Sequence, residues 1–263
     1  MANCLHCVVY MEQIADTGPV QCKVCDAPSP LYGVVDFHKS CIEQQGRRLM
    51  LSGYPIYFRR CTACGFAFTT AFDQWTDEEF RQRIYNDDYV QVDPDFVEAR
   101  PKQNAELIRN NFGQMREQIG ILDFGGGSGL MTNLLAEEGF RAITYDPFSE
   151  HRNAPDGRFE LITCFEVMEH VPFPRQTAAH MHGLLAEDGA ILFSTLVQPQ
   201  PFDAVGLNWW YAGPRNGHIS LYTPAALAAL FAPFNLRVVS FSPGLHMAYG
   251  RVPEFARHLN LPD

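Results

Sequence analysis

The residues with the clearest chemical potential are Glu166, Glu169 and His170, in the segment Glu-Val-Met-Glu-His. If a helical turn begins at Glu166, the i, i+3 and i+4 spacing brings both carboxylates and the imidazole to one face. Two oxygens and one nitrogen that converge in this way suit a hard divalent cation, Mg²⁺ or Mn²⁺. Without a cation, two clustered carboxylates repel each other and need a shared proton. The segment therefore predicts a catalytic metal site, a metal-free acid/base group or a structural turn, and these alternatives stay open.

Two Cys-x-x-Cys pairs form a second feature, and they lie in the first quarter of the chain. Cys22 and Cys25 make one pair, while Cys61 and Cys64 make the other, which a glycine follows. Each pair lets two thiolates share one metal ion, and the glycine relieves crowding where backbone amides turn toward sulfur. The four cysteines predict one structural zinc ion.

The remaining cysteines of this region leave two alternatives. In one, Cys4 and Cys7 join the first pair and His38 and Cys41 join the second, so that the chain holds two zinc ions. In the other, no metal binds. No secretory signal pattern precedes these cysteines, so a reducing, cytoplasmic location is expected, where thiols act as ligands or core residues rather than disulfides.

A glycine-rich turn follows the apolar run at residues 121–124, and an apolar helical pattern begins at residue 130. A strand, a glycine turn and a helix in this order open a nucleotide-binding α/β unit, whose helix N-terminus favours an anionic group. The dinucleotide pattern Gly-x-Gly-x-x-Gly requires glycine or alanine where Leu130 stands. The expected ligand is therefore a nucleoside-containing molecule other than a dinucleotide.

The spacing Gly-x-Gly-x-Gly with an acid upstream resembles motif I of the class I S-adenosylmethionine (SAM) methyltransferases. Asp146, at the end of the next expected strand (residues 141–145), can accept both hydroxyls of a ribose. The resemblance implies SAM as the cofactor. The candidate cofactor-binding residues are Asp123, Gly125, Gly127, Gly129, Asp146, Phe165 and Tyr89. Tyr85 and Tyr89 form either a lid over the cofactor or aromatic packing between modules.

The Glu-x-x-Glu-His segment resembles a motif of the small-RNA 2′-O-methyltransferases and the quinone-pathway O-methyltransferases, in which it holds a divalent metal beside the acceptor hydroxyl. This resemblance makes Glu166, Glu169 and His170 candidate catalytic residues, with His218 as a fourth. A cysteine module before such a core is similar to bacterial zinc-module methyltransferases, including sugar C-methyltransferases. Val171 and Pro172 follow His170 in place of the tyrosine motif of that group, which argues against C-methylation.

The elements expected to position these residues form an α/β fold: a Rossmann-like methyltransferase sheet with helices on both faces, plus a small zinc-ribbon-like β module. The expected domains are a cysteine-rich zinc-binding module (1–72), a connecting helix and lid-like segment (73–102) and a SAM-dependent methyltransferase domain (103–263). After the fifth expected strand lie four candidate substrate-binding residues, Trp209, Trp210, Tyr211 and Arg215. Aromatic walls suit a ring or sugar and arginine suits a phosphate or carboxylate, although a packed loop fits equally well.

Charge and hydropathy narrow the partners. The net charge of −10 leaves no broad basic footprint for nucleic acid, and no apolar run reaches membrane-spanning length. Taken with the resemblances to methyltransferases, this makes O-methylation of a hydroxyl on a small molecule or a sugar or glycan precursor the expected function. Two rivals remain: an RNA 2′-O-methyltransferase that uses the zinc module as a reader, and a non-catalytic SAM-binding partner protein. The sequence fixes neither the acceptor nor the oligomeric state.

Overall fold

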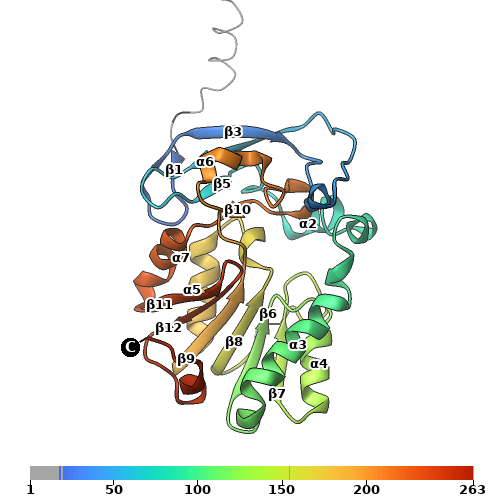
Figure 1. Cartoon of the computed structure of the whole chain (residues 1–263). Helices are drawn as coiled ribbons and strands as arrows, with labels where there is room; N and C mark the ends of the chain where they lie inside the picture. The colour runs from blue at the N-terminus through green and yellow to red at the C-terminus, as the bar shows by residue number, and fades with distance from the viewer. Residues whose placement is uncertain (1–17, 19, 154, 263) are drawn as a thin grey trace, which may run out of the picture.

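The computed structural model describes residues 18, 20–153 and 155–262. Cys4 and Cys7, which one zinc alternative uses, lie outside these residues. The described chain forms two stacked layers, a small antiparallel sheet above a larger, mostly parallel one (Figure 1).

The larger layer is built on a six-stranded sheet of order β11-β12-β9-β8-β6-β7. The four strands β7, β6, β8 and β9 run parallel, and β12 and β11 are antiparallel to their neighbours. The strand bounds are β6 Gly120–Phe124, β7 Arg141–Tyr145, β8 Phe159–Phe165, β9 Leu185–Ser194, β11 Arg237–Ser242 and β12 Leu245–Tyr249. The expected Rossmann-like methyltransferase sheet is confirmed.

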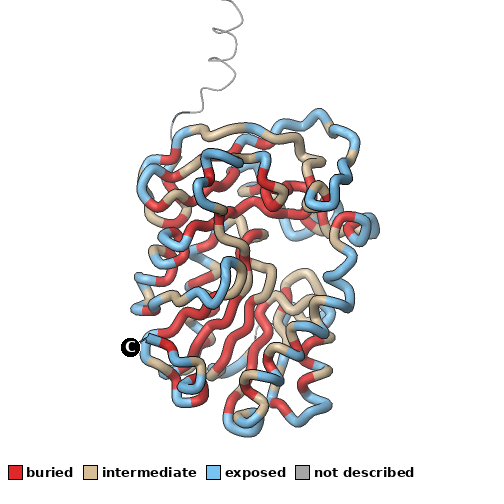
Figure 2. Tube along the Cα trace, in the orientation of Figure 1, coloured by how far each residue is buried: buried red, intermediate tan, exposed pale blue. Residues whose placement is uncertain are grey.

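Helices cover both faces of this sheet because successive strand residues point to opposite sides. Along β6, Ile121 packs in one core with α3 and α4, whereas Leu122 and Phe124 pack in another with α5 and α7. The helix bounds are α3 Ala99–Phe112, α4 Leu130–Glu137, α5 Pro174–Leu184 and α7 Pro224–Phe231. Figure 2 shows the buried residues concentrated along the central strands. The sheet is thus a rigid platform that fixes the loops at its edge.

The smaller layer is a four-stranded antiparallel sheet of order β10-β5-β4-β3, beside the two-stranded β1-β2 ribbon. The bounds are β1 Val20–Gln21, β2 Pro28–Ser29, β3 Leu31–Asp36, β4 Pro55–Arg60, β5 Ala67–Thr69 and β10 Ser220–Leu221. Strand β10 comes from the second half of the chain and pairs with β5, placing Ser220 opposite Phe68. The N-terminal sheet is therefore completed by a strand that the sequence assigned to the methyltransferase domain.

The connecting segment begins with α2, Asp77–Arg83, and continues through the short 3-10 helices η2, Asp87–Gln91, and η3, Pro94–Phe96. A capping box begins α2, because the Thr76 hydroxyl accepts from the Glu79 N–H and the Glu79 carboxylate accepts from the Thr76 N–H. The short α6, Phe202–Val205, precedes the aromatic-rich segment. Within the described residues no helix is both long and apolar enough to cross a bilayer.

Candidate functional site

The glycine turn at the end of β6 lies in close contact with Val167, in the loop after β8, and with the Asp123 side chain of its own strand. Gly125 has φ of +80°, and a Cβ there would lie 2.4 Å from Val167 Cγ2. A Cβ at Gly126 would lie 2.1 Å from Asp123 Oδ2. Only glycine fits at these two positions without a shift of the chain. Because Val167 follows β8, this contact also places the loop after β8 directly beside the glycine turn.

Asp123 lies beneath the turn rather than in front of it. Its side chain is 4 % exposed and its Oδ1 accepts a hydrogen bond from the Thr163 hydroxyl at 2.8 Å. Burial raises the pKa of Asp123 to about 7, and the nearby Asp146 carboxylate acts in the same direction. The geometry gives Asp123 a supporting contact with the turn; its expected contact with the cofactor stays a prediction.

Asp146 stands at the end of β7 and is joined to the turn. Its Oδ2 accepts from the Gly127 N–H at 2.9 Å, and its Oδ1 accepts from the Phe148 N–H at 2.7 Å. A Cβ on Gly127 would meet no atom within 4 Å, so the outer side of the turn is open. Gly129 is the N-cap of α4. The structure therefore brings Asp146 together with the glycines at the parallel-strand edge, where ligands bind in this class of sheet.

Glu166 directly follows β8 and has a left-handed backbone conformation, with φ of +54°. Its N–H donates to Ser194 Oγ at 2.8 Å, and that hydroxyl donates back to Glu166 Oε1 at 2.7 Å. This backbone angle ends the regular structure, so the helical turn starts only at Met168, as the 3-10 helix η5, Met168–His170. The assumption of a helix beginning at Glu166 is therefore wrong, and Glu166 is held to the end of β9.

Glu169, His170 and His218 form a cluster without Glu166. One ligand atom of each of the three lies within 4.8 Å of the others. Glu169 is fully buried, its Oε1 accepts from the Tyr211 hydroxyl at 2.5 Å, and its Oε2 has no hydrogen-bond partner among the described residues. Burial, reinforced by the charge of Glu166, raises the pKa of Glu169 well above its ordinary range. When no cation is bound, the raised pKa favours the protonated, neutral form of Glu169.

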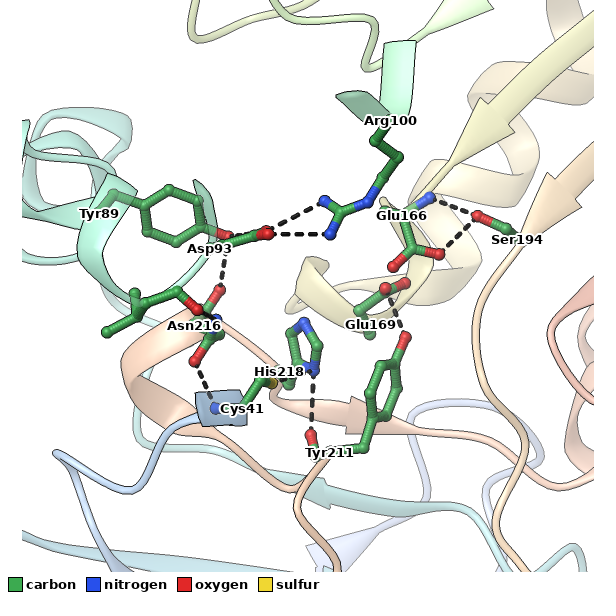
Figure 3. A network of polar contacts seen from close by, with 11 residues as sticks. Cys41, Tyr89, Asp93, Arg100, Glu166, Glu169, Ser194, Tyr211, Asn216 and His218 are labelled. Carbon is green, nitrogen blue, oxygen red and sulfur yellow. Dashed lines mark hydrogen bonds and ion pairs between the residues drawn. The ribbon is translucent and has the colours of Figure 1, made fainter. Parts of the chain in front are cut away.

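His218 has a defined tautomer. Its Nδ1 lies 3.0 Å from the Tyr211 carbonyl oxygen. A carbonyl only accepts, so we assign the ring proton to Nδ1, which leaves a lone pair on Nε2. Burial, followed by the neighbouring His170, lowers the pKa of His218 well below its ordinary value. Figure 3 shows the second ring nitrogen directed away from Tyr211, toward the space between Arg100 and Glu169.

His170 lies beside His218, with ring centroids 4.8 Å apart, and its Nδ1 has no hydrogen-bond partner among the described residues. Burial lowers the pKa of His170 to about 4; the nearby Asp93 opposes this shift and Arg100 supports it. Both imidazoles are therefore neutral at pH 7.

We expect the shift at His170 to make folding stability depend on pH. The unfolded chain binds a proton at this histidine below about pH 6.5, whereas the folded chain binds it only below about pH 4. The stabilisation by neutral His170 is thus complete above pH 6.5 and is lost as the pH falls toward 4, by at most about 3 kcal/mol. Urea unfolding of wild type and His170→Gln at several pH values measures this, with the exposed His258→Gln as control. If the free energy of unfolding changed with pH by the same amount in all three proteins, the result would contradict this expectation.

An ion pair that the sequence did not predict lies near the histidine cluster. Arg100 Nη1 and Nη2 donate to the two carboxylate oxygens of Asp93 at 3.0 and 2.8 Å (Figure 3). The Tyr89 hydroxyl donates to the same carboxylate at 3.3 Å, and the Tyr89 side chain is 5 % exposed. Tyr85 makes edge contacts with the rings of Tyr89 and His170. In this structure Tyr85 and Tyr89 pack the connecting segment against the cluster.

The aromatic segment after β9 is largely packed. Trp209 and Tyr211 are 8 % and 2 % exposed, whereas Trp210 is half-buried. Arg215 is buried and donates to the Ile84 carbonyl at 3.0 Å and to Asn86 Oδ1 at 3.2 Å. Its guanidinium thus binds the connecting segment. Of the four candidate substrate-binding residues, Tyr211 contacts the cluster, through its hydroxyl to Glu169 and its carbonyl to His218. Phe165, which is a candidate cofactor-binding residue, is the last residue of β8 and is half-buried.

The four cysteines of the two pairs converge on one point. The Sγ atom of Cys25 lies 3.4 Å from that of Cys61 and 3.5 Å from that of Cys64. The Sγ atoms of Cys22 and Cys64 lie 3.7 Å apart. A tetrahedral zinc site with Zn–S bonds of about 2.3 Å separates its sulfurs by roughly 3.8 Å. The amide of Val24 donates to Cys22 Sγ. Both the spacing and the amide contact suit a Cys₄ metal site.

His38 and Cys41 do not join this group. His38 Nδ1 bonds the Met50 carbonyl at 2.8 Å, and Cys41 Sγ lies 3.4 Å from His218 Nδ1. The second site of the two-zinc alternative therefore lacks these two ligands, and Cys41 instead lies beside the histidine cluster. Nothing in the local sequence around Cys41 indicated that contact, because the partner lies 177 positions away.

Comparison with known proteins adds a family. A family described as "Methyltransferase domain" matches residues 96–241. Among curated proteins, "Ubiquinone biosynthesis O-methyltransferase" of Pasteurella multocida is 27 % identical over 110 residues, which is 29 % of this chain and 46 % of that protein. The Pseudomonas aeruginosa protein of the same name is 24 % identical over 130 residues, covering 38 % and 55 %. The chain thus spans about half the length of these relatives.

Solved structures are more distant. The 1,6-didemethyltoxoflavin-N1-methyltransferase of Burkholderia thailandensis, with bound 1,6-didemethyltoxoflavin and S-adenosylhomocysteine, has a TM-score of 0.47 and 15 % identity, covering 76 % of this chain and 96 % of that one. The magnesium protoporphyrin IX methyltransferase of Synechocystis, with bound S-adenosylhomocysteine, has a TM-score of 0.43 and 14 % identity, covering 68 % and 97 %. These scores are too low to support an argument about function.

Proposed function

Because the chain belongs to the methyltransferase-domain family, we propose that it is a SAM-dependent methyltransferase and that it methylates a hydroxyl oxygen of a small-molecule or sugar acceptor. The observation that carries the choice of oxygen is the neutral His218, whose Nδ1 bonds the Tyr211 carbonyl and whose Nε2 is left as an acceptor. A hydroxyl group must lose its proton during methylation, so a basic nitrogen at the acceptor side is the group this reaction needs. The names of the O-methyltransferase relatives agree with the proposal.

SAM, when bound, supplies an electrophilic methyl group. We assign its binding to the glycine turn and to Asp146, whose carboxylate would accept the ribose hydroxyls. The residues fit this group in two respects. The outer side of the turn is open at Gly127, and the carboxylate is fixed at the end of β7 by backbone amides. The helix dipole of α4 adds a positive end behind the turn, although α4 has only eight residues.

His218 acts on the acceptor in this scheme. Its Nε2 would accept the hydroxyl proton when the methyl group passes from the SAM sulfur to the acceptor oxygen, which leaves S-adenosylhomocysteine. The low pKa of His218 keeps the ring neutral and ready to accept a proton at pH 7. Glu169 is fixed by Tyr211, and its unpartnered Oε2 is free to hydrogen-bond the acceptor. Positioning of the acceptor supplies much of the remaining rate.

A second mechanism rests on the same cluster. The unpartnered atoms Glu169 Oε2 and His170 Nδ1 are also what a divalent cation would bind, with His218 as the third ligand. Two nitrogens and one oxygen favour Mn²⁺ over Mg²⁺. Glu166 is not part of the group, so this site has three protein ligands and not the four expected from the sequence. In this scheme the cation lowers the pKa of the acceptor hydroxyl.

We propose that the Cys₄ group holds structural zinc. We also propose the division into residues 1–72, 73–102 and 103–263, except that strand β10 is counted with the N-terminal sheet. Strand β10 belongs to the last part of the chain yet completes the N-terminal sheet. Arg175 of α5 also binds the first cysteine pair, through the Val24 carbonyl at 2.7 Å and the Asp26 carboxylate. The module is therefore a docked part of the enzyme rather than a separate unit.

Two other functions are outcomes of binding tests. An RNA-modifying enzyme would be retained on RNA at moderate salt, which the net charge of −10 disfavours. A non-catalytic partner protein would bind SAM without transferring the methyl group. Incubation with isotope-labelled SAM and a metabolite extract tests the proposal itself. Label on an oxygen of a small molecule is the expected result, and label on RNA, carbon or nitrogen would contradict it.

We expect Asp146→Ala to weaken the binding of SAM and of S-adenosylhomocysteine by about 2–4 kcal/mol, because charge-assisted bonds to the ribose hydroxyls are lost. Titration calorimetry measures the affinity. Asp188→Ala, which removes a carboxylate on the surface of β9 that pairs with Arg251, is the matched control and should bind as wild type does. Equal affinity in wild type and Asp146→Ala would remove Asp146 from the site.

A further inference from the structure

The N-terminal module makes three hydrogen bonds with the loop that precedes His218. The Arg215 N–H donates to the Lys39 carbonyl at 3.0 Å, and Lys39 Nζ donates to the Trp209 carbonyl at 2.9 Å. The Cys41 N–H donates to Asn216 Oδ1 at 2.8 Å. Residues 39–41, which are far from the loop in sequence, therefore hold it at three points.

Asn216 is the point where three segments meet. Its side chain is 1 % exposed and uses both of its polar atoms, since Oδ1 accepts from Cys41 and Nδ2 donates to the Val92 carbonyl at 3.2 Å. Its own carbonyl lies 3.4 Å from the Tyr89 hydroxyl, whose single proton is shared between this oxygen and the Asp93 carboxylate (Figure 3). One buried amide thus joins the module, the connecting segment and the loop, two residues before His218.

The residue after His218 is fixed from both sides. The Ile219 carbonyl accepts from the Thr69 N–H at 3.2 Å, next to the β5–β10 pairing, and the Ile219 N–H donates to the Glu169 carbonyl at 2.9 Å. His218 is therefore flanked by one residue tied to Cys41 and Val92 and another tied to β5 and Glu169. Buried amides that are satisfied on both sides fix one local conformation.

We propose that Asn216 is a positioning residue through which the N-terminal module sets the orientation and tautomer of His218. The module thus completes the acceptor side of the active site, in addition to its own metal site. Without the contacts from Cys41 and Val92, the loop relaxes, the bond from Nδ1 to the Tyr211 carbonyl is no longer enforced, and Nε2 loses its direction. The inference rests on the proposed function only where it assigns His218 as the base.

Nitrogen-15 NMR of histidine-labelled, SAM-bound protein at one fixed pH tests the tautomer directly, and a His218→Asn sample assigns the His218 signals. Wild type is expected to show a protonated Nδ1 and an unprotonated Nε2. Asn216→Ala is expected to give a mixture of tautomers. Asn216→Asp keeps an acceptor for the Cys41 N–H and should recover part of the wild-type pattern.

Arg175→Gln is the control, because it breaks module docking at α5 instead of at the loop and should leave the His218 signals unchanged. Once an acceptor is known, Asn216→Ala should lower kcat by about 10–100-fold without changing the KM for SAM. Wild-type His218 signals in Asn216→Ala would overturn the proposal. If that variant does not fold, Asn216→Leu, which fills the same space without either polar atom, takes its place, and wild-type His218 signals with unchanged kcat in Asn216→Leu would overturn the proposal. Should His218→Asn retain full activity, the base assignment fails, but the tautomer result still decides the role of Asn216.

Discussion

Replacing His218 by asparagine is expected to lower the rate of methyl transfer by about 10²–10⁴-fold, the usual contribution of a positioned general base. The side-chain amide of asparagine can still donate to the Tyr211 carbonyl, as Nδ1 of His218 does at 3.0 Å. The substitution therefore removes the basic Nε2 while keeping the anchoring bond. SAM affinity should not change, because the glycine turn and Asp146 do not contact His218.

One control variant separates the role of the base from other roles of a histidine. His180 packs against the rings of Phe124 and Tyr145 on the α5 side of the sheet, so His180→Asn should keep wild-type activity. Wild-type turnover by His218→Asn, measured with the acceptor found by isotope labelling, would show that the base is a different group.

The chelator experiment distinguishes the two mechanisms that share His218. A metal-free base leaves activity unaffected by a mild chelator, whereas a cation on Glu169, His170 and His218 makes activity vanish and return with Mn²⁺. SAM binding should survive both treatments. Elemental analysis of the treated protein must show that the cysteine site has kept its metal, so that a loss of activity reports on the histidine cluster alone.

The parts of the site that the sequence predicted are contiguous along the chain. The glycine turn, Asp146 and each Cys-x-x-Cys pair are local patterns, in which a strand or a tight turn forces the spacing. The glycine turn and Asp146 could also be placed together, because the carboxyl ends of the parallel strands β6 and β7 lie at one edge of the sheet. Periodicity and spacing were sufficient for this.

The parts that the sequence did not predict depend on long-range packing. Asn216 bonds Cys41 and Val92, which lie 175 and 124 positions away. Strand β10 has only two residues, too few for a periodic pattern. The left-handed backbone of Glu166 was also hidden, since glutamate rarely adopts it and Ser194 stabilises it from the neighbouring strand. Such features arise from tertiary contacts that no local pattern records.

Removing metal from the cysteine site is expected to have the largest effect on stability. A structural zinc contributes about 10–16 kcal/mol to folding in small zinc modules, which is as large as the whole net stability of a typical domain, about 5–15 kcal/mol. Protein purified without added metal should therefore contain one tightly held zinc ion per chain. Cys61→Ser should lose that ion and melt at a much lower temperature than wild type.

The loss should spread beyond the module, because β5 follows the second cysteine pair and holds β10, next to His218. The Thr223 hydroxyl also donates to the Cys64 carbonyl at 2.6 Å at the start of α7. Hydrogen exchange should accordingly rise at residues 219–223 in Cys61→Ser and stay low in the central strand β8. Cys41→Ser is the matched control: its sulfur lies outside the Cys₄ group, so it should keep one zinc per chain. If metal-free protein kept its melting temperature and its protection at β10, the four cysteines would be core thiols without a bound ion.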